Sequence, residues 1–155
     1  MSVKDAAERF SIKRMDQISI SKGQSLIAID PGGNTGIATK IDGIYHTETT
    51  PLPDVVFGHI NNGDWDVVIY EDFNTSGNIS KDGQHTLKLI GGILALCWRR
   101  DIKPYRQMPQ ARMAFLARAN GILKKIKDKT TNHEKDALAH LLKWEYESYG
   151  TTGPI

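Results

Sequence analysis

Hydrophobic residues in this chain gather into short runs, and two of these runs end on acidic side chains. Leu26–Ile29 is an apolar, β-branched run typical of a strand that is buried on both faces, and Asp30 follows it directly. The stretch DVVIYEDF over 66–73 predicts a second such strand, which ends on Glu71 and Asp72. Burying a carboxylate at the end of a strand costs free energy unless a partner offsets its lost hydration. Each strand therefore places an acid where a partner is needed.

The rest of the pattern alternates helices with further strands. Asp42-Gly43 separates two β-like runs, Thr35–Ile41 and Ile44–Thr49, which predicts a hairpin closed by a two-residue turn. The other predicted elements are helices over 51–63, 84–100, 109–120 (opened by Pro109 and stopped by Asn120-Gly121) and 133–149, a short strand over 102–108, a polar loop over 74–83 and a basic connector over 122–132. This order predicts an α/β fold with a mixed central sheet flanked by helices.

Composition favours one domain with a sizeable core. The chain has 155 residues, of which 39% are hydrophobic. We expect an N-terminal extension over 1–22, one folded domain over 23–150 and a tail over 151–155. No apolar run is long enough to span a membrane, the N-terminus lacks the apolar core of a secretory signal, and Cys97 is the only cysteine. These features predict a cytoplasmic protein.

Charge is distributed unevenly along the chain. Residues 99–129 contain ten basic and two acidic side chains, a balance of +8, which leaves −6 for the rest of a chain whose net charge is +2. A basic block beside an acidic remainder favours a polyanion partner held near a group of carboxylates. A charged face exposed to solvent explains the composition equally well.

The predicted strands bring Asp30 and Glu71 to the same edge of the sheet if they are neighbours, and ligands of open α/β sheets bind at such edges. The last helix supplies a third position, because His133 and Asp136 are three residues apart and share one of its faces. His140 lies about one turn further along.

Glu134 has a structural explanation, because it fits a helix-capping box with Thr131, and this leaves His133 and Asp136 for chemistry. Carboxylates with one histidine suit hard cations such as Mg²⁺ or Mn²⁺. Two such ions can clamp the attacking and leaving oxygens of a phosphodiester. Each piece also has a simpler reading: an ordinary Asp-Pro-Gly-Gly turn, a strand end that meets solvent, or a surface histidine.

Three segments together resemble one nuclease family. "IDPGGNTGIA", "IYEDF" and "HEKDALAHLL" are similar to the RuvC-like Holliday-junction resolvases, and most similar to phage-type members, within the RNase H-like nuclease superfamily. The resemblance extends from about Leu26 to Trp144. It implies an RNase H-like fold and a metal-dependent endonuclease that resolves branched DNA by paired phosphodiester cleavage. It also implies that the protein acts in the cytoplasm of a bacterial or phage-infected cell.

The same resemblance implies roles for particular residues. Asp30, Glu71, His133 and Asp136 would bind two Mg²⁺ ions per active site, with Mn²⁺ able to substitute. Pro109–Arg112 is similar to a family element that ends in a phosphate-binding lysine, which would make Arg112 a phosphate ligand. The resemblance also suggests that Phe73 stacks on DNA bases, for which core packing is an equally good explanation. Independently of the resemblance, the charge of the basic segment predicts DNA backbone contacts by Lys124, Lys125 and Lys127.

The family also acts as a homodimer on four-way junctions, and Y-forks are a further possible substrate. The expected interface is the helix over 84–100, where Gly91-Gly92 predicts a close approach to another backbone. Burial of that helix on its own sheet is the alternative.

Two rival functions remain open from the sequence. The segment around Asp30 also resembles the phosphate-binding hairpin of sugar kinases and actin-like ATPases, but those proteins need two such domains, and this chain has room for one. A non-catalytic module that binds branched DNA is the second rival, although it would not need all three acids.

Overall fold

The computed structural model of the chain describes residues 23–72 and 80–150. The predicted extension over 1–22, the tail over 151–155 and Phe73 lie outside these residues. A five-stranded sheet in the order β3-β2-β1-β4-β5 forms the centre of the described part. Its strands are β1 (Leu26–Asp30), β2 (Thr35–Ile41), β3 (Ile44–Thr50), β4 (Val67–Glu71) and β5 (Pro104–Gln107). β1, β4 and β5 are parallel, whereas β2 is antiparallel to both of its neighbours, so the sheet is mixed, as predicted.

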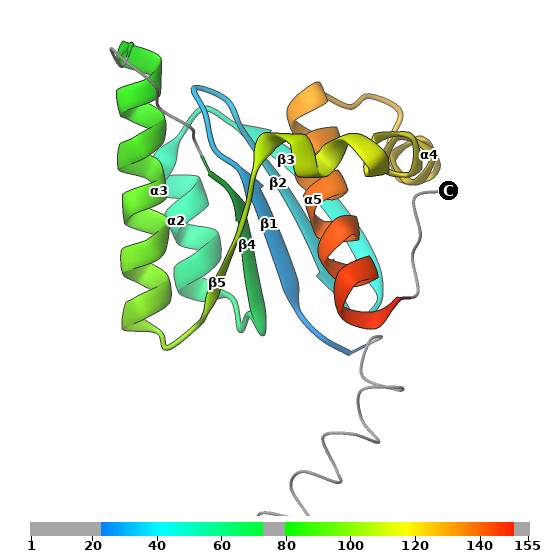
Figure 1. The fold of residues 1–155 in the computed structure, drawn as a ribbon, viewed down its shortest axis with the longest axis horizontal. Coiled ribbons are helices and arrows are strands. Elements are labelled where there is room, and N and C mark those ends of the chain that lie inside the picture. The colour runs from blue at the N-terminus through cyan, green and yellow to red at the C-terminus, as the bar shows by residue number, and fades with distance from the viewer. Residues whose placement is uncertain (1–22, 73–79, 151–155) are drawn as a thin grey trace, which may run out of the picture.

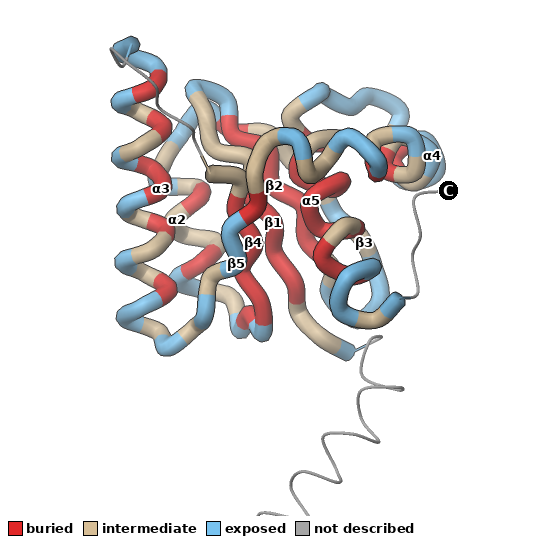
Figure 2. The backbone as a smooth tube through the Cα atoms, in the orientation of Figure 1, coloured by how far each residue is buried: buried red, intermediate tan, exposed pale blue. Residues whose placement is uncertain are grey.

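Helices cover both faces of this sheet. α2 (Pro53–Asn62) and α3 (Lys81–Arg99) lie on one side, and the 3-10 helix η2 (Pro109–Phe115), α4 (Leu116–Ile126) and α5 (Asn132–Tyr149) lie on the other (Figure 1). Side chains that alternate along β1 divide between the faces, so Leu26 and Ala28 join the core under α5 while Ile27 and Ile29 join the core under α2 and α3. The two cores leave β1 and β4 buried along most of their length (Figure 2).

The β2–β3 hairpin and the helix-capping box are confirmed. Both turn residues of the hairpin, Asp42 and Gly43, have positive φ (51° and 78°), as a two-residue turn that matches the strand twist requires. At the start of α5 the Thr131 side chain accepts from the Glu134 backbone N–H, and the Glu134 carboxylate accepts from the Thr131 backbone N–H.

Two predicted helix boundaries are wrong. The helix over 84–100 begins earlier, at Lys81, because the Ser80 hydroxyl accepts from the Gly83 backbone N–H and caps it. The helix predicted to stop at Asn120-Gly121 runs on as α4 to Ile126, so half of the predicted basic connector is helical. Burial of the Leu123 side chain under this turn outweighs the weak helix preference of Asn and Gly.

α5 is held against the hairpin at both of its ends. Near its C-terminus the Glu145 carboxylate, only 2% exposed, accepts from Lys40 Nζ on β2 and from the Tyr45 hydroxyl on β3, both at 2.7 Å. At its N-terminus the backbone of α5 touches Gly36 on β2. A Cβ at Gly36 would lie 1.9 Å from the carbonyl oxygen of His133. Gly36 therefore sets how closely the first turn of α5 approaches the sheet.

No helix within the ranges 23–72 and 80–150 combines the length and the apolar character needed to cross a membrane.

Gly36→Ala should lower the free energy of unfolding by about 3 kcal/mol, because the new methyl group meets backbone that cannot rotate away. Gly33→Ala is the matched control, since a Cβ at Gly33 has no neighbour within 4 Å. Urea denaturation of the two variants checks the difference, and equal stability of the two would contradict the close contact.

Candidate active site

Three polar side chains form a row across the parallel strands. Ile29 pairs with Tyr70, which places Asp30 beside Glu71 at the next position, and Glu71 pairs with Gln107 on β5. All three residues continue the alternation that faces α5, because Ala28 on β1 and Ile69 on β4 belong to the core beneath that helix. β1, β4 and β5 end on the same side of the sheet, near the start of α5 (Figure 1). Asp30, Glu71 and Gln107 therefore lie beside α5, and contact its residues His133 and His140.

α5 directs two further predicted residues toward the same edge. His133 is partly exposed, and its Nδ1 lies 3.9 Å from Asp30 Oδ2. Asp136 lies one turn along, and its side chain is 21% exposed. The structure thus brings together the four residues predicted to form the catalytic centre: Asp30, Glu71, His133 and Asp136.

Arg112 spans the acidic residues. The η2 helix carries its guanidinium between two carboxylates, with Nη1 3.3 Å from Glu71 Oε1 and Nε 3.2 Å from Asp136 Oδ1. Nη1 also donates to the Pro109 carbonyl at 2.8 Å, which holds the side chain over its own helix. Arg112 is therefore the counter-charge of this acidic cluster.

Glu71 has a second partner on its other side. Its Oε2 lies 2.8 Å from Nε2 of His140, an imidazole that is completely buried. Gln107 lies on the far side of that ring, with Oε1 2.6 Å from His140 Nδ1 and its amide nitrogen donating to the His140 carbonyl at 3.2 Å. His140 thus has an oxygen at each ring nitrogen.

The electrostatics of the cluster differ between its two central acids. Burial, followed by the neighbouring Glu71 and Asp136 carboxylates, raises the pKa of Asp30 to about 8. Burial also acts to raise the pKa of Glu71, but its hydrogen bonds with His140 and Asp30, together with the charges of His140 and Arg112, outweigh it and leave that pKa below its usual range. Glu71 is therefore the stable anion, and Asp30 is the acid whose ionisation needs an added positive charge.

The donor set fits a hard divalent cation. Three carboxylates and an imidazole are ligands of the kind that Mg²⁺ and Mn²⁺ accept, and a cation here would relieve the repulsion that raises the pKa of Asp30. Among the described residues, no three His, Cys, Asp or Glu side chains stand in the arrangement of a metal site. The guanidinium of Arg112 lies between Glu71 and Asp136 in this arrangement.

The residues predicted to contact DNA differ in their surroundings. Phe73 lies outside the described residues. Lys124 and Lys125 are exposed on the last turn of α4. Lys127 instead forms an ion pair with the buried carboxylate of Glu134 and donates to the Thr47 carbonyl at 3.1 Å. A phosphate contact by Lys127 would therefore compete with an existing structural contact.

The lysines therefore separate into structural and available groups. Lys40 and Lys127 hold α5 against the hairpin, through Glu145 and Glu134. The positive charge of segment 99–129 includes Lys127. A lysine that is paired with a buried carboxylate contributes little to a DNA-binding surface. On α4, the exposed side chains of Lys124 and Lys125 carry positive charge that is available to a ligand.

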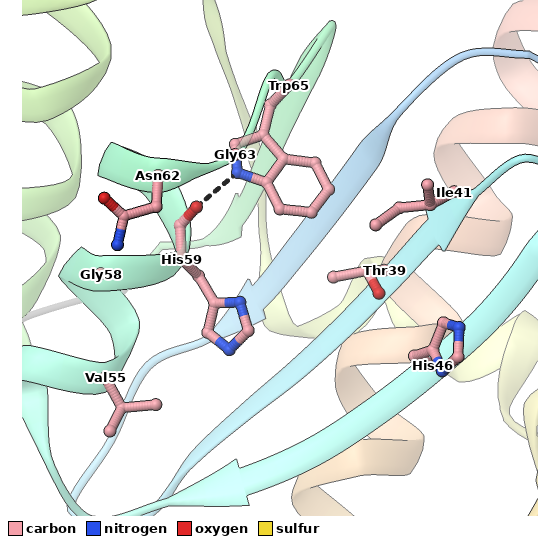
Figure 3. A pocket seen from close by; sticks show the side chains of 9 residues that line it. All are labelled: Thr39, Ile41, His46, Val55, Gly58, His59, Asn62, Gly63 and Trp65. Atoms are coloured by element: carbon pink, nitrogen blue, oxygen red, sulfur yellow. Dashed lines mark hydrogen bonds between the residues drawn. The ribbon is translucent and has the colours of Figure 1, made fainter.

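A cleft of about 560 Å³ lies on the opposite side of the hairpin, between α2 and the strands β2 and β3 (Figure 3). Its lining includes His46, His59 and Trp65, whose indole donates to the His59 carbonyl at 2.7 Å. None of the predicted site residues lines this cleft. The acidic cluster, where the charge is concentrated, is the better candidate for chemistry.

Gln107 and the contact of His140 with Glu71 were missed by sequence reasoning. The available signal was that a third predicted strand, over 102–108, includes a polar residue near its end, as the other two do. Recognising it required knowing that β5 lies parallel to β4 and in which register.

Among the solved structures that resemble the described fold are two of RuvC from Thermus thermophilus. One, RuvC in complex with a Holliday junction substrate, has 18% sequence identity and a TM-score of 0.61 over 85% of this chain and 99% of that chain. The other has 20% identity and a TM-score of 0.55 over 85% of this chain and 100% of that chain. No family model and no curated protein matches the sequence. The chain therefore has an RNase H-like fold of the RuvC kind, as the sequence resemblance implied.

Asp30 should make the stability of the metal-free protein depend on pH. Below about pH 4 the folded and unfolded chains both hold its proton, whereas between its ordinary pKa of 3.8 and about 8 only the folded chain does. The contribution of Asp30 to stability is therefore lost as pH rises through this window. Asp30→Asn should be more stable than the parent by on the order of 3 kcal/mol near pH 9 and equal to it below about pH 4. Denaturation series in EDTA measure the difference, and parallel pH curves would contradict it.

Proposed function

We propose that this protein is a metal-dependent endonuclease that resolves Holliday junctions or related branched DNA. The observation that carries the proposal is the meeting of Asp30, Glu71 and Asp136 at one edge of a RuvC-like sheet. The solved RuvC in complex with a Holliday junction substrate supports the same substrate class. The phage-type assignment rests on the sequence motifs.

The residues of the acidic cluster and the basic side chains near it would have separate roles. Asp30, Glu71, Asp136 and His133 would hold Mg²⁺ or Mn²⁺, two ions per site. When bound, such ions polarise a phosphodiester and activate the attacking water. Arg112 lies at the same edge, and its guanidinium can bind a phosphate oxygen once the carboxylates have another counter-charge. The exposed basic side chains of α4 extend this positive surface along the DNA backbone.

The first test is cleavage of labelled four-way junction, Y-fork and linear duplex, with Mg²⁺ or with EDTA. Asp30→Asn should reduce cleavage of the branched substrates by at least about 100-fold, because it removes a metal-binding anion. Junction binding should persist, since the variant repels DNA less. Asp42→Asn is the matched control, because Asp42 lies in the exposed hairpin turn. Normal turnover by Asp30→Asn would remove Asp30 from the mechanism.

A non-catalytic module that binds branched DNA is the second candidate, and Arg112 is the observation in its favour. Its single positive charge already lies between Glu71 and Asp136, where a metal ion would otherwise offset their charge. Junction binding in the absence of any Mg²⁺- or Mn²⁺-dependent cleavage would establish this alternative.

The lysines of α4 should provide affinity that does not depend on DNA sequence. Replacing Lys124 and Lys125 with glutamine should weaken binding to all DNA forms and flatten the log–log salt dependence by roughly 0.9 for each phosphate that is no longer neutralised. Lys127→Gln is an informative comparison, because removal of its ion pair with Glu134 should also lower thermal stability. Binding measured by anisotropy between low and high salt checks the slopes, and unchanged slopes would mean that Lys124 and Lys125 do not contact DNA.

We further propose that the protein acts as a homodimer through α3. The two glycines of this helix differ: a Cβ on Gly92 would lie 2.5 Å from the Phe57 ring of α2, whereas one on Gly91 would meet nothing within 4 Å. The predicted close approach at Gly92 is thus made to a side chain of the same chain. Gly91 instead lies on an outer stripe with Leu87, Leu94 and Trp98, and Trp98 is 87% exposed. Such a stripe on the outer face of the helix favours a second copy, and a two-fold dimer would match the symmetry of a junction.

Sedimentation at micromolar concentration should give twice the 17.3 kDa chain mass. Trp98→Glu should yield monomers that convert a cruciform plasmid to nicked circles, whereas the parent should produce linear DNA by paired cuts. Ile44→Asp, which charges an exposed apolar position on β3, should remain dimeric. A parent protein that is monomeric and only nicks the plasmid would contradict the dimer proposal.

A further inference from the structure

His140 is a buried polar side chain that the family resemblance does not use. It is 0% exposed and lies among Ala137, Leu138 and Leu141 on the inner face of α5. An imidazole in such surroundings costs free energy unless both ring nitrogens have partners. Both do, because Nδ1 faces Gln107 and Nε2 faces Glu71.

Gln107 determines how the ring is held. Its amide nitrogen donates to the His140 carbonyl, so its carbonyl oxygen is the atom that faces Nδ1. That oxygen can only accept, so Nδ1 donates to it, and because the Glu71 carboxylate can likewise only accept, Nε2 also donates and the ring carries both protons. Nδ1 and the backbone carbonyl of His140 are thus both hydrogen-bonded to the side chain of Gln107 on β5. The ring cannot turn without breaking a buried hydrogen bond.

The consequence appears at the two oxygens of Glu71. Oε2 faces His140 Nε2 in the interior, whereas Oε1 faces Arg112 at the edge of the acidic cluster. A partial rotation of the carboxylate would break the hydrogen bond between Oε2 and Nε2, whereas a half-turn would only exchange two equivalent oxygens. Oε1 is therefore the oxygen on the side of Arg112, whose Nε pairs with Asp136.

We propose that His140 and Gln107 are positioning residues that hold Oε2 of Glu71, so that Glu71 offers a metal ion one oxygen in a set orientation. This inference rests on the proposed function, because it assigns the pair a role in a metal site. Without His140, the carboxylate is free to turn both oxygens toward Arg112, whose guanidinium then competes with the cation. Groups that orient a metal ligand from behind typically contribute 10–100-fold to metal affinity.

The experiment measures Mn²⁺ binding to the full chain without DNA, by the electron paramagnetic resonance signal of free Mn²⁺. His140→Leu should weaken binding by about 10–100-fold. His140→Gln should restore most of the affinity, because its amide nitrogen can donate to Oε2. Gln107→Met, which is close in shape, should weaken binding in the same direction. The double variant His140→Leu/Gln107→Met should bind no more weakly than His140→Leu alone.

Cleavage provides an independent readout of positioning. The Mg²⁺ concentration for half-maximal cleavage should rise in His140→Leu and Gln107→Met by a factor similar to the decrease in Mn²⁺ affinity. Leu141→Ala is the control for loosened packing, because Leu141 is equally buried on α5 but belongs to the apolar core. It should lower the melting temperature and leave Mn²⁺ affinity unchanged.

Glu71→Gln separates failure of this inference from failure of the proposed function. If Glu71→Gln abolishes Mn²⁺ binding while Gln107→Met and folded His140→Leu bind normally, the positioning role is overturned and the metal site stands. If Glu71→Gln also binds Mn²⁺ normally, the proposed metal site itself is wrong. Equal decreases of affinity in His140→Leu and His140→Gln would likewise overturn the role assigned to the hydrogen bond.

Discussion

The contact between Gly36 on β2 and the His133 carbonyl on α5 sets the geometry of the candidate active site. A side chain at Gly36 would overlap that carbonyl, so the helix can approach the sheet this closely only because the strand has a glycine there. Asp30 is the register partner of Gly36 on β1. The same row of the sheet therefore carries both the acid and the point at which the helix bearing His133 and Asp136 rests.

The acidic cluster shows how a buried site balances charge before any ligand arrives. Asp30, Glu71 and Asp136 converge from two strands and a helix, and their mutual repulsion adds to the cost of burial. Arg112 offsets part of this cost from the open side, and His140 does so from the interior. Glu71 contacts both Arg112 and His140, and its pKa is lowered. Asp30 forms no hydrogen bond or ion pair with either of these two residues, and its pKa is raised. Of these two acids, Asp30 is therefore the one whose ionisation an added cation would favour more.

The sequence by itself determined the features that depend on near neighbours. The apolar runs predicted the strands, Asp42-Gly43 predicted the turn, and spacing along the last helix predicted both its capping box and the shared face of His133 and Asp136. The four predicted site residues were found by the same means, with the family resemblance to assign their roles. The spacing of hydrophobic residues and the residue types of turns are local features, so they can be predicted from a single sequence.

Only the tertiary structure decided the contacts between distant segments. Burial of Leu123 carries α4 through Asn120-Gly121, which a local propensity cannot foresee. The pairing of β4 with β5 brings Gln107 beside Glu71, and packing of α5 then places His140 between them. Arg112 reaches Glu71 and Asp136 because η2 crosses the same edge of the sheet. Each of these contacts depends on strand register and helix packing, which arise when the whole core forms and are not encoded in any one stretch of the chain.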